Sequence, residues 1–515
     1  MQKPSQKLDS LPPTEQLLVA GGDVRLDLDP LSGLNKYGCQ PFPDPQLLAF
    51  GSSTASVIST EGFAVADQLR QDLLEAISTD SPKAVYDQQI QRIRLEWLKL
   101  CELSDVPGVE LILSSSGTDI HAIAAQYTGS GISTPALIIM VEANETGSGV
   151  ASTLSGNSII GNNAVEVVQV SIRLDDGMPR PPVEIDDEVD ALVAKAVTSD
   201  RRVLLILVDQ SKTGLIAPSP ACVMTLHRRY PDNIEVLVDA CQFRIALPTL
   251  RAYLEQGFIV ALTGSKFLSA PSFSAALLLP SSIAKRLQKR AFPRGLLSCS
   301  SNVHWPVNWA GAEHLDHIAN FGLLLRFKVA VEELRRFCAV QQTDTINFLQ
   351  TFAQVILQRL ISDPHFEILP VPQLDRHPLI QANNWDDLQT IFPFLLYDPQ
   401  NDVRIPLNSE QTRNVYQRLQ TELFSPADGD EVQSSPWSAT LDFTHPNSNI
   451  ATIRCQLGQP VACGTRNGIG VSALRLCLSS RLIIEATAHG DKGATIIKDA
   501  LTTLDKTALL IQSSQ

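Results

Sequence analysis

Residues 257–280 read GFIVALTGSKFLSAPSFSAALLLP and hold two apolar runs separated by a short polar turn. The first run is rich in apolar and β-branched residues, and it predicts a buried strand that ends near Thr263. The turn then brings Lys266 to the edge of a sheet, and the second run predicts another strand. Burial at such an edge lowers the pKa of a lysine, which prepares its amine to add to a carbonyl group. A solvated loop lysine is the commoner alternative for any single lysine.

Similar apolar runs lie before this stretch and alternate with amphipathic segments from about residue 82 to residue 291. This alternation is typical of successive strand–helix units that build a parallel sheet. Helices are predicted at AVYDQQIQRIRLEWLKLCEL and HAIAAQY, and strands at VELILS, PALIIMV, VEVVQVSI, RRVLLILV, IEVLVDA, GFIVALTG and FSAALLL. We therefore predict an α/β fold built on a mixed, layered sheet.

The length of 515 residues is too great for one compact core and predicts two domains. We expect an N-terminal arm at 1–60, a large domain at 61–320, and a linker helix followed by a small C-terminal α+β domain at 321–515. The linker helix is predicted from NFGLLLRFKVAVEELRRF, a small-domain strand from NIATIRCQL and the last helix from GATIIKDALTTL.

Composition narrows the function classes. The formal net charge of -14 disfavours binding to nucleic acid or to an anionic membrane surface. The start, MQKPSQKLDSLPPTEQ, has no apolar core typical of a signal peptide, and no run is long enough to span a bilayer, so we expect a cytoplasmic protein. The nine cysteines form no close pairs of the metal-binding or redox type, and no metal site is predicted.

Two further segments carry possible chemistry. SSSGTD, residues 114–119, lies between a predicted strand and a predicted helix, so its backbone N–H groups at Ser116, Gly117 and Thr118 could hold a phosphate. The alternative is an ordinary helix cap. In IEVLVDACQF, Asp239 follows a buried strand at the edge where open α/β sheets bind ligands, and a carboxylate there can keep a pyridinium nitrogen protonated. An Asp that ends a strand is also a common helix cap.

The order of the three segments favours one explanation, because a phosphate loop, a carboxylate and a lysine together fit a single cofactor. In this order the sequence resembles the pyridoxal-phosphate enzymes of fold type I, in the branch of class V aminotransferases and cysteine desulfurases. The resemblance covers roughly residues 109–291 and implies a mostly parallel, seven-stranded-type sheet flanked by helices. It also implies pyridoxal 5'-phosphate as the cofactor and a homodimer.

The resemblance assigns roles to individual residues. Lys266 would hold the cofactor as a Schiff base, Asp239 would face the pyridine nitrogen, and Gln242 would donate to the ring oxygen. Thr263 and Ser265, from a Thr-Gly-Ser-Lys turn, would join Ser116, Gly117 and Thr118 around the phosphate. Lys212, in DQSKTGLIAP, is a rival lysine, but it precedes the carboxylate, which is the wrong order for the family.

The sequence departs from the family where an aromatic ring or histidine usually covers the cofactor. PALIIMV is followed there by Glu142, Ala143, Asn144 and Glu145, so Asn144 is the predicted facing residue. His121 is interpreted instead as a residue on the face of its helix. This departure makes a specialised reaction more plausible.

Substrate recognition by this family requires a guanidinium that clamps the carboxylate of an amino acid. By resemblance, Arg475 in ALRLCLSSRL is the candidate, and Arg481 is its competitor. Tyr37 and residues 52–55 (SSTA) are proposed to close the pocket because of their side-chain character.

Transamination is the predicted reaction, with the ring as electron sink and Lys266 as acid and base. The alternatives are a desulfurase or lyase reaction in which Cys463 receives sulfur, a decarboxylation, and a catalytically silent protein that uses the fold for binding. For Cys463, burial as a packing residue is the competing interpretation.

Overall fold

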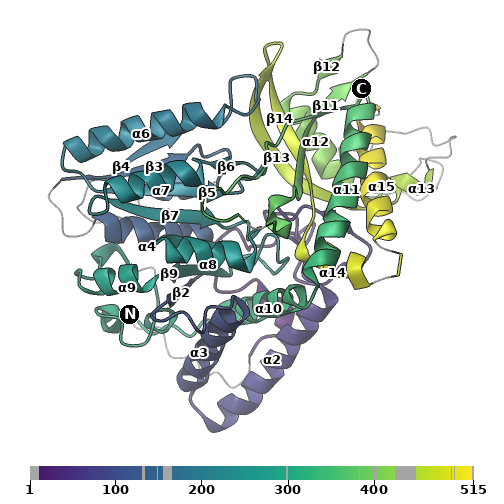
Figure 1. Ribbon diagram of the computed structural model, residues 1–515. Coiled ribbons are helices and arrows are strands. Elements are labelled where there is room, and N and C mark those ends of the chain that lie inside the picture. Colours follow the sequence, from purple (N-terminus) through teal and green to yellow (C-terminus); the bar gives the residue numbers. More distant parts are fainter. Residues whose placement is uncertain are drawn as a thin grey trace.

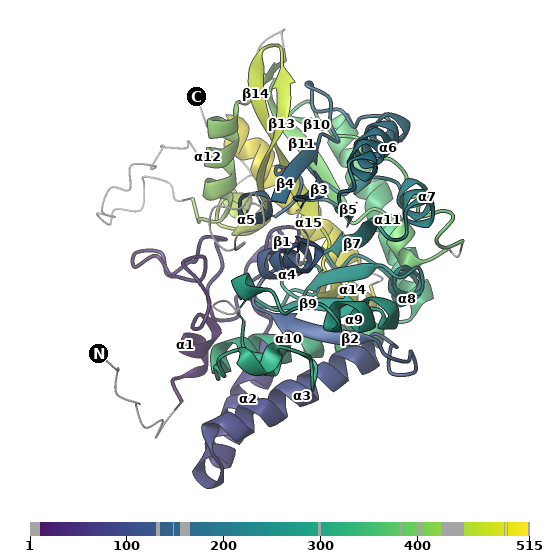
Figure 2. The same cartoon turned by 90° about the vertical axis from the view of Figure 1, so that its left-hand side faces the viewer.

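The computed structural model describes residues 11–129, 134–147, 149–154, 165–296, 300–381, 383–399, 404–423, 448–488, 490–491 and 493–512. These residues form a large α/β part and a smaller α+β part that lie side by side (Figures 1 and 2). Within the described ranges, no helix has the length and apolar content needed to cross a membrane.

The central sheet of the large part has the strand order β2-β9-β8-β7-β5-β3-β4, and the short β6 pairs with β5. Strands β4, β3, β5, β7 and β8 are parallel, whereas β9 is antiparallel to both of its neighbours. The strands are β2 Glu110–Ser114, β3 Ala136–Val141, β4 Val165–Val170, β5 Val203–Asp209, β6 Ile216–Ala217, β7 Ile234–Ala240, β8 Ile259–Thr263 and β9 Ala275–Leu279. All seven strands predicted for this region are present, and the predicted mostly parallel sheet is confirmed.

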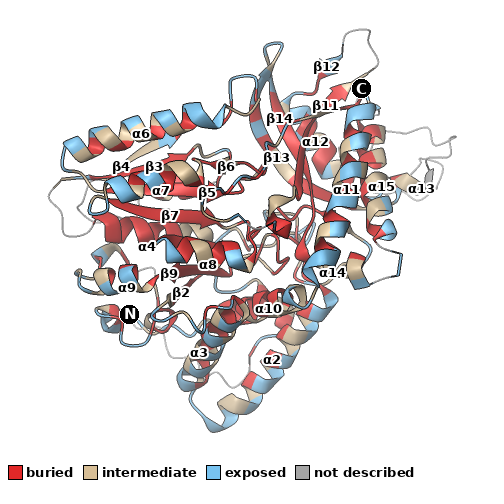
Figure 3. Ribbon diagram, in the orientation of Figure 1, coloured by how far each residue is buried: buried red, intermediate tan, exposed pale blue. Residues whose placement is uncertain are grey.

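Helices cover both faces of this sheet. Helix α4 (Gly117–Gly129) packs on one face, and α6 (Pro182–Thr198), α7 (Pro220–Arg229) and α8 (Leu247–Glu255) pack on the other (Figures 1 and 2). All residues of β5, β7 and β8 are buried, as Figure 3 shows for the centre of the sheet. Two-sided burial explains why these strands are almost continuously apolar. Because they are parallel, their carboxyl ends meet at one edge. The shorter helices of this part are α5 Val150–Leu154 and α9 Ser281–Gln288.

Three long helices form a layer at the bottom of Figure 1: α2 (Thr60–Thr79), α3 (Pro82–Leu100) and α10 (Phe321–Cys338). Helix α10 is the predicted linker helix. Its buried Arg326 donates hydrogen bonds to the carbonyl oxygens of Leu18, Ala20 and Phe273, which fixes the N-terminal arm and α1 (Thr14–Leu18) against the large part.

The small part is built on a sheet of strand order β1-β13-β14-β11-β10, with β12 paired to β11. Its strands are β1 Leu48–Phe50, β10 Phe366–Ile368, β11 Ile391–Asp398, β12 Ile405–Pro406, β13 Cys455–Arg466 and β14 Ile469–Cys477, and its helices are α11 Gln342–Ser362, α12 Ser409–Leu419, α13 Ser448–Ala451, α14 Ser480–Ala488 and α15 Ala494–Gln512. Strand β1 comes from the predicted arm and pairs in parallel with β13. The strand predicted at NIATIRCQL begins only at Cys455, because a turn bond from Ile453 N to Ile450 O interrupts the extended backbone.

Buried polar contacts join the two parts. Arg376 forms an ion pair of 2.7 Å with Asp209 at the end of β5, and both side chains are almost fully buried. Arg244, which follows β7, donates to the carbonyl oxygen of Leu478 and the hydroxyl of Thr390. These contacts hold the small part beside the carboxyl edge of the central sheet.

Candidate active site

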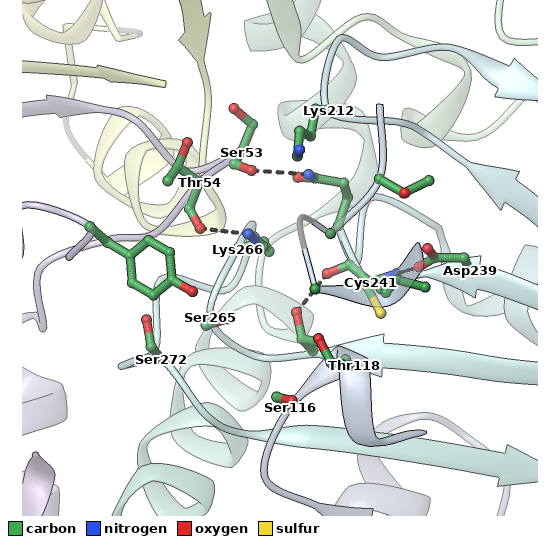
Figure 4. A pocket seen from close by; sticks show the side chains of 18 of the residues that line it. Ser53, Thr54, Ser116, Thr118, Lys212, Asp239, Cys241, Ser265, Lys266 and Ser272 are labelled. Carbon is green, nitrogen blue, oxygen red and sulfur yellow. Dashed lines mark hydrogen bonds between the residues drawn. The ribbon is translucent and has the colours of Figure 1, made fainter. Parts of the chain in front are cut away.

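A cavity of about 410 Å³ lies at the carboxyl edge of the central sheet. Residues at or just beyond the ends of β5, β7 and β8 line it, together with the start of α4, parts of the N-terminal arm and residues of β13 and β14. The volume falls within the range of about 300–1,000 Å³ that is common for ligand sites. Figure 4 shows this cavity from close by.

Lys266 reaches the cavity from the turn after β8. Gly264 makes this turn possible, because a Cβ at that position would lie only 2.5 Å from the Cβ of Ala330. The Nζ atom of Lys266 donates a 2.6 Å hydrogen bond to the carbonyl oxygen of Thr54 (Figure 4). Burial, and then the positive charge of Lys212, lower the pKa of Lys266 to about 8. The amine is therefore far easier to deprotonate than an ordinary lysine.

Asp239 is the penultimate residue of β7, the strand next to β8, and lines the same cavity. Its carboxylate lies 3.2 Å from Nε2 of His121, and both side chains are buried. Burial alone would raise the pKa of Asp239, but His121 and the N–H group of Cys241 hold it below the ordinary value. Conversely, Asp239 raises the pKa of His121 against the effect of burial. The two side chains form a buried pair in which each favours the charged form of the other.

His121 was interpreted as a residue of a helix face, and the structure adds a role in this pair. Its Nδ1 atom lies 2.6 Å from the carbonyl oxygen of Gly117. A carbonyl oxygen only accepts, so Nδ1 carries a proton and Nε2 faces the carboxylate. The signal available from the sequence is the spacing Gly117–His121, which is one helical turn.

Helix α4 begins at Gly117, so the predicted phosphate loop does lie at a helix N-terminus facing the cavity. The carboxylate of Asp119 accepts hydrogen bonds from the N–H and hydroxyl groups of Ser116. Ser116 and Asp119 therefore cap the helix, and the next N–H groups, which have no partner within the helix, could face a phosphate. A Cβ at Gly117 would lie 3.2 Å from the Sγ atom of Cys241, so a larger residue would fill the cradle.

Thr263 and Ser265 complete this side of the cavity. The hydroxyl of Thr263 donates to the carbonyl oxygen of Cys241 at 2.6 Å, which ties the ends of β7 and β8 together. In Figure 4, Ser116 and Thr118 lie below Lys266, whereas Lys212 lies above it.

Arg475 of β14 enters the cavity from the small part and is 1% exposed. Its guanidinium donates to the carbonyl oxygen of Lys212 at 3.2 Å, to the hydroxyl of Thr54 at 3.1 Å, and to the carbonyl oxygen of Gln459. Its Nε atom has no hydrogen-bond partner among the described residues. Arg481 instead donates to the carbonyl oxygen of Val57 and lines a different cavity.

Glu145, rather than Asn144, is the residue after β3 that lines the cavity. The prediction for the Asn144 side chain is not supported by its position, because that residue is exposed and is not part of the wall. The cause is a turn bond from Glu145 N to Glu142 O, which directs Asn144 outward and Glu145 inward. Only the backbone carbonyl of Asn144 is used here, as an acceptor for Nζ of Lys212 at 3.1 Å.

The Glu145 carboxylate is fully engaged. It accepts from Nε of Arg173 at 2.5 Å, from the hydroxyl of Ser211 at 2.7 Å, and from the N–H of Thr213 at 3.2 Å. Burial would raise its pKa, but Arg173 and these donors hold it below the ordinary value. This network fixes the loop after β5, which carries Lys212.

The N-terminal arm contributes more of the cavity wall than the sequence could indicate. Tyr37, Ser53 and Thr54 line the cavity as expected, whereas Ser52 and Ala55, which were expected there too, are not part of its wall. Gln242 also lies there, but its side-chain amide donates to the carbonyl oxygen of Ser53 at 3.1 Å. Arg25 was not predicted; its guanidinium lies over the ring of Phe273, 4.6 Å from the ring centroid. No local sequence signal connects this arm to residues so distant in the chain.

Cys463 does not line the cavity. It lies in β13 within an apolar cluster that includes Leu369, Tyr397 and Val461. Burial raises the pKa of its thiol to about 11. A thiol in this position is a packing residue rather than an accessible thiolate.

Solved structures establish the fold. The chain is similar to a NifS-like protein from Rickettsia africae, with a TM-score of 0.51, 10% identity, and coverage of 90% of this chain and 99% of that one. It is also similar to the cysteine desulfurase CsdA from Escherichia coli, with a TM-score of 0.52, 12% identity, and coverage of 90% and 95%. The chain has the fold of the pyridoxal-phosphate-dependent enzymes of fold type I. The fold implied by the sequence resemblance is therefore confirmed.

A third neighbour agrees with these two. The apo cysteine desulfurase from Thermococcus onnurineus matches with a TM-score of 0.50, 8% identity, and coverage of 88% of this chain and 93% of that one. No protein-family model matches the chain. No curated protein matches it either.

The fold implies pyridoxal 5'-phosphate as the cofactor, and the cavity fits this molecule. The start of α4 is a cradle that a Cβ at Gly117 would fill, as a phosphate site requires. A buried carboxylate and a lysine of lowered pKa line the same cavity from neighbouring strands. These are the three kinds of group that the cofactor needs: phosphate donors, an anion for the ring nitrogen and an amine for the aldehyde.

Proposed function

We propose that this chain is a pyridoxal-phosphate-dependent enzyme that acts at the α-carbon of an amino acid and catalyses amino transfer. The observation that carries the proposal is the position of Lys266, a half-buried amine with a pKa of about 8 in the same cavity as the Asp239–His121 pair. When bound, the cofactor supplies an electron sink that stabilises negative charge at the α-carbon.

Each residue has a definite task in this proposal. Lys266 would hold the cofactor through its amine, and Ser116, Gly117 and Thr118 would hold the phosphate with Thr263 and Ser265. Asp239 keeps a protonated ring nitrogen stable, because its own charge is maintained by His121. The Lys266 amine would also be placed to move the proton at the α-carbon of the substrate.

Arg475 is proposed to bind the carboxylate of the substrate. Its buried guanidinium lies in the cavity wall, and its Nε atom has no hydrogen-bond partner among the described residues. A planar guanidinium matches a carboxylate in two-point contact. Arg481 is less suited, because it lines another cavity.

Amino transfer is favoured over desulfuration by the positions of the thiols. Cys463 is buried in an apolar cluster and is not part of the cavity wall. Cys241 does line the cavity, but burial and then the charge of Asp239 raise the pKa of its thiol well above the ordinary value. Neither thiol is prepared to accept sulfur as a thiolate.

Two lysines in the cavity allow a matched test. The protein reconstituted with pyridoxal 5'-phosphate should show the visible absorption of the cofactor joined to a lysine, and Lys266→Ala should abolish it. Lys212→Ala should retain the band. A band that survives in the Lys266 variant and disappears in the Lys212 variant would refute the assignment. Transfer of amino groups to a 2-oxo acid, without sulfide release from cysteine, then distinguishes a transferase from a desulfurase.

A further inference from the structure

The cavity holds three cationic side chains that lack an anionic partner. Lys266, Lys212 and Arg475 line it, and among the described residues none has a carboxylate oxygen within 4.0 Å. Their observed partners are carbonyl oxygens and the hydroxyl of Thr54. Placing charges in a buried site without counter-charges is costly, so such a site is suited to anions.

Two carboxylates of the same cavity are in direct contact with other cations. Asp239 is paired with His121 at 3.2 Å, and Glu145 is paired with Arg173 at 2.5 Å. At the mouth of the cavity, the exposed Lys36 adds a further positive charge. The chain has a net charge of -14, so this local excess of positive charge opposes the average of the molecule.

The position of Lys212 is built by the fold. Its N–H group donates to the carbonyl oxygen of Glu145 at 2.9 Å, and its own carbonyl oxygen accepts from Arg475 at 3.2 Å. The next residue, Thr213, is bound to the Glu145 carboxylate through its N–H group. Gly214 then turns the loop with a φ of +91°, in the region that favours glycine. The loop therefore presents Lys212 at a fixed place in the wall.

Lys212 has no role in the proposed reaction once the other charged groups are assigned to the cofactor and to the substrate carboxylate. The amine of Lys266 is used to hold the cofactor, whose phosphate belongs to the start of α4. Arg475 is proposed to bind the α-carboxylate, which every α-amino acid carries. Lys212 lies on the other side of Lys266 from Ser116 and Thr118 (Figure 4), away from the phosphate cradle. Its ammonium group is left for a second anion.

We propose that Lys212 binds a second anionic group on the side chain of the substrate, so that the preferred substrate is an acidic α-amino acid. This inference rests on the proposed function and adds the substrate class to it. The side-chain group is a carboxylate, a sulfonate or a phosphate, since each offers oxygen acceptors to an ammonium donor. Lys36 at the mouth favours entry of such anions by electrostatic attraction.

The test compares near-isosteric amino acids on the reconstituted protein. Binding of aspartate and of asparagine is measured by calorimetry and by the change in the visible spectrum, with cysteate and phosphoserine as the sulfonate and phosphate arms and serine as their neutral reference. We expect an acidic amino acid to bind about tenfold or more tightly than its neutral counterpart, because a charge-assisted hydrogen bond is gained. The tightest of the three acids identifies the anionic group.

A variant then assigns the preference to one residue. Lys212→Gln should reduce the ratio of affinities to near one, whereas Lys212→Arg should keep it. The exposed Lys83, remote from the cavity wall, gives the control Lys83→Gln, which should leave the ratio unchanged. The inference would be overturned if the unmodified protein bound aspartate no more tightly than asparagine, and bound cysteate and phosphoserine no more tightly than serine.

Two results separate this inference from the proposed function. If the protein binds no cofactor through Lys266, the proposed function itself is wrong. If the cofactor binds and neutral amino acids change its spectrum as strongly as acidic ones, the function stands and the substrate class is wrong. If Lys212→Gln alters the pH dependence of the cofactor spectrum and keeps the affinity ratio, Lys212 acts on the cofactor, and the inference is also overturned.

Discussion

The side-chain amine of Lys266 donates a 2.6 Å hydrogen bond to the backbone carbonyl oxygen of Thr54, 212 residues earlier in the chain. A carbonyl oxygen accepts this bond without adding a negative charge, so it orients the amine without supplying the counter-charge that would raise its pKa. Lys212 and Arg475, also in the cavity wall, lower that pKa further. The cavity thus presents an amine that is oriented and easily deprotonated.

Capture of the cofactor should follow the ionisation of Lys266. Only the neutral amine attacks an aldehyde, and its fraction rises as the pH rises through the pKa of about 8. The rate at which cofactor-free protein binds pyridoxal 5'-phosphate should therefore be half-maximal at about pH 8 and level off at higher pH. Stopped-flow absorbance across a pH series measures this. A rate that still climbs toward the ordinary lysine pKa of about 10.4 would contradict the lowered value.

A variant of the neighbouring Lys212 tests why the pKa of Lys266 is low. Lys212→Met removes the positive charge that is, after burial, the second cause of the lowered pKa of Lys266. The midpoint of the profile should then move to higher pH. Lys83→Met, at an exposed position outside the cavity wall, should leave the midpoint in place.

The ionisation of His121 should depend on Asp239. In the native protein, burial lowers and Asp239 raises the pKa of His121, and the net result is above the ordinary value of 6.5. Asp239→Asn removes the charge and leaves the burial, so the pKa should fall below 6.5. NMR titration of the histidine ring reports this directly. An unchanged pKa would mean that the 3.2 Å contact is not an ion pair in solution.

Much of the central site was predictable because its parts are local. Asp239 and Lys266 each follow an apolar strand, and these strands proved to be neighbours, with Asp239 opposite Ala261 in the register. Strong burial leaves a clear pattern of apolar residues, so strand positions and their edge could be inferred. The start of the helix near Gly117 could be predicted because it closely follows another apolar strand.

Other parts of the site depend on contacts that composition does not encode. Arg25 lies in an arm that Arg326 fixes to α10, some 300 residues later in the chain. Thr54 follows β1, which pairs with β13 some 400 residues later. Whether Asn144 or Glu145 faces inward is decided by one turn after β3, and a shift of one residue reverses the direction of a side chain. His121 pairs with Asp239 across two elements, which helix spacing alone does not predict.

Substrate affinity should distinguish the two arginines that the sequence left open. Arg475→Gln should raise the KM for an amino acid by about 10- to 100-fold, because one or more charge-assisted hydrogen bonds are lost. Arg481→Gln is the matched control and should change KM little, since Arg481 lines another cavity. Steady-state kinetics with both variants checks this. The reverse result would assign the carboxylate to Arg481.

Cys463→Ala should leave cofactor binding and turnover intact. The thiol is 1% exposed, lies in an apolar cluster and has a pKa of about 11. We expect only a small loss in the free energy of unfolding, about 1 kcal/mol. Thermal unfolding and activity assays measure the two effects separately. A variant that folds normally but loses sulfide release from cysteine would instead support the desulfurase alternative.

The phosphate cradle should be sensitive to a single methyl group at Gly117. A Cβ there would lie 3.2 Å from the Sγ atom of Cys241, closer than comfortable packing allows. Overpacking of this kind costs about 1–3 kcal/mol, so Gly117→Ala should weaken binding of pyridoxal 5'-phosphate by about tenfold or more. Cys241→Ala removes the opposing sulfur and should restore much of the affinity in the double variant, giving a measurable coupling energy. If the double variant binds as weakly as Gly117→Ala alone, the methyl group acts on the phosphate itself rather than through Cys241.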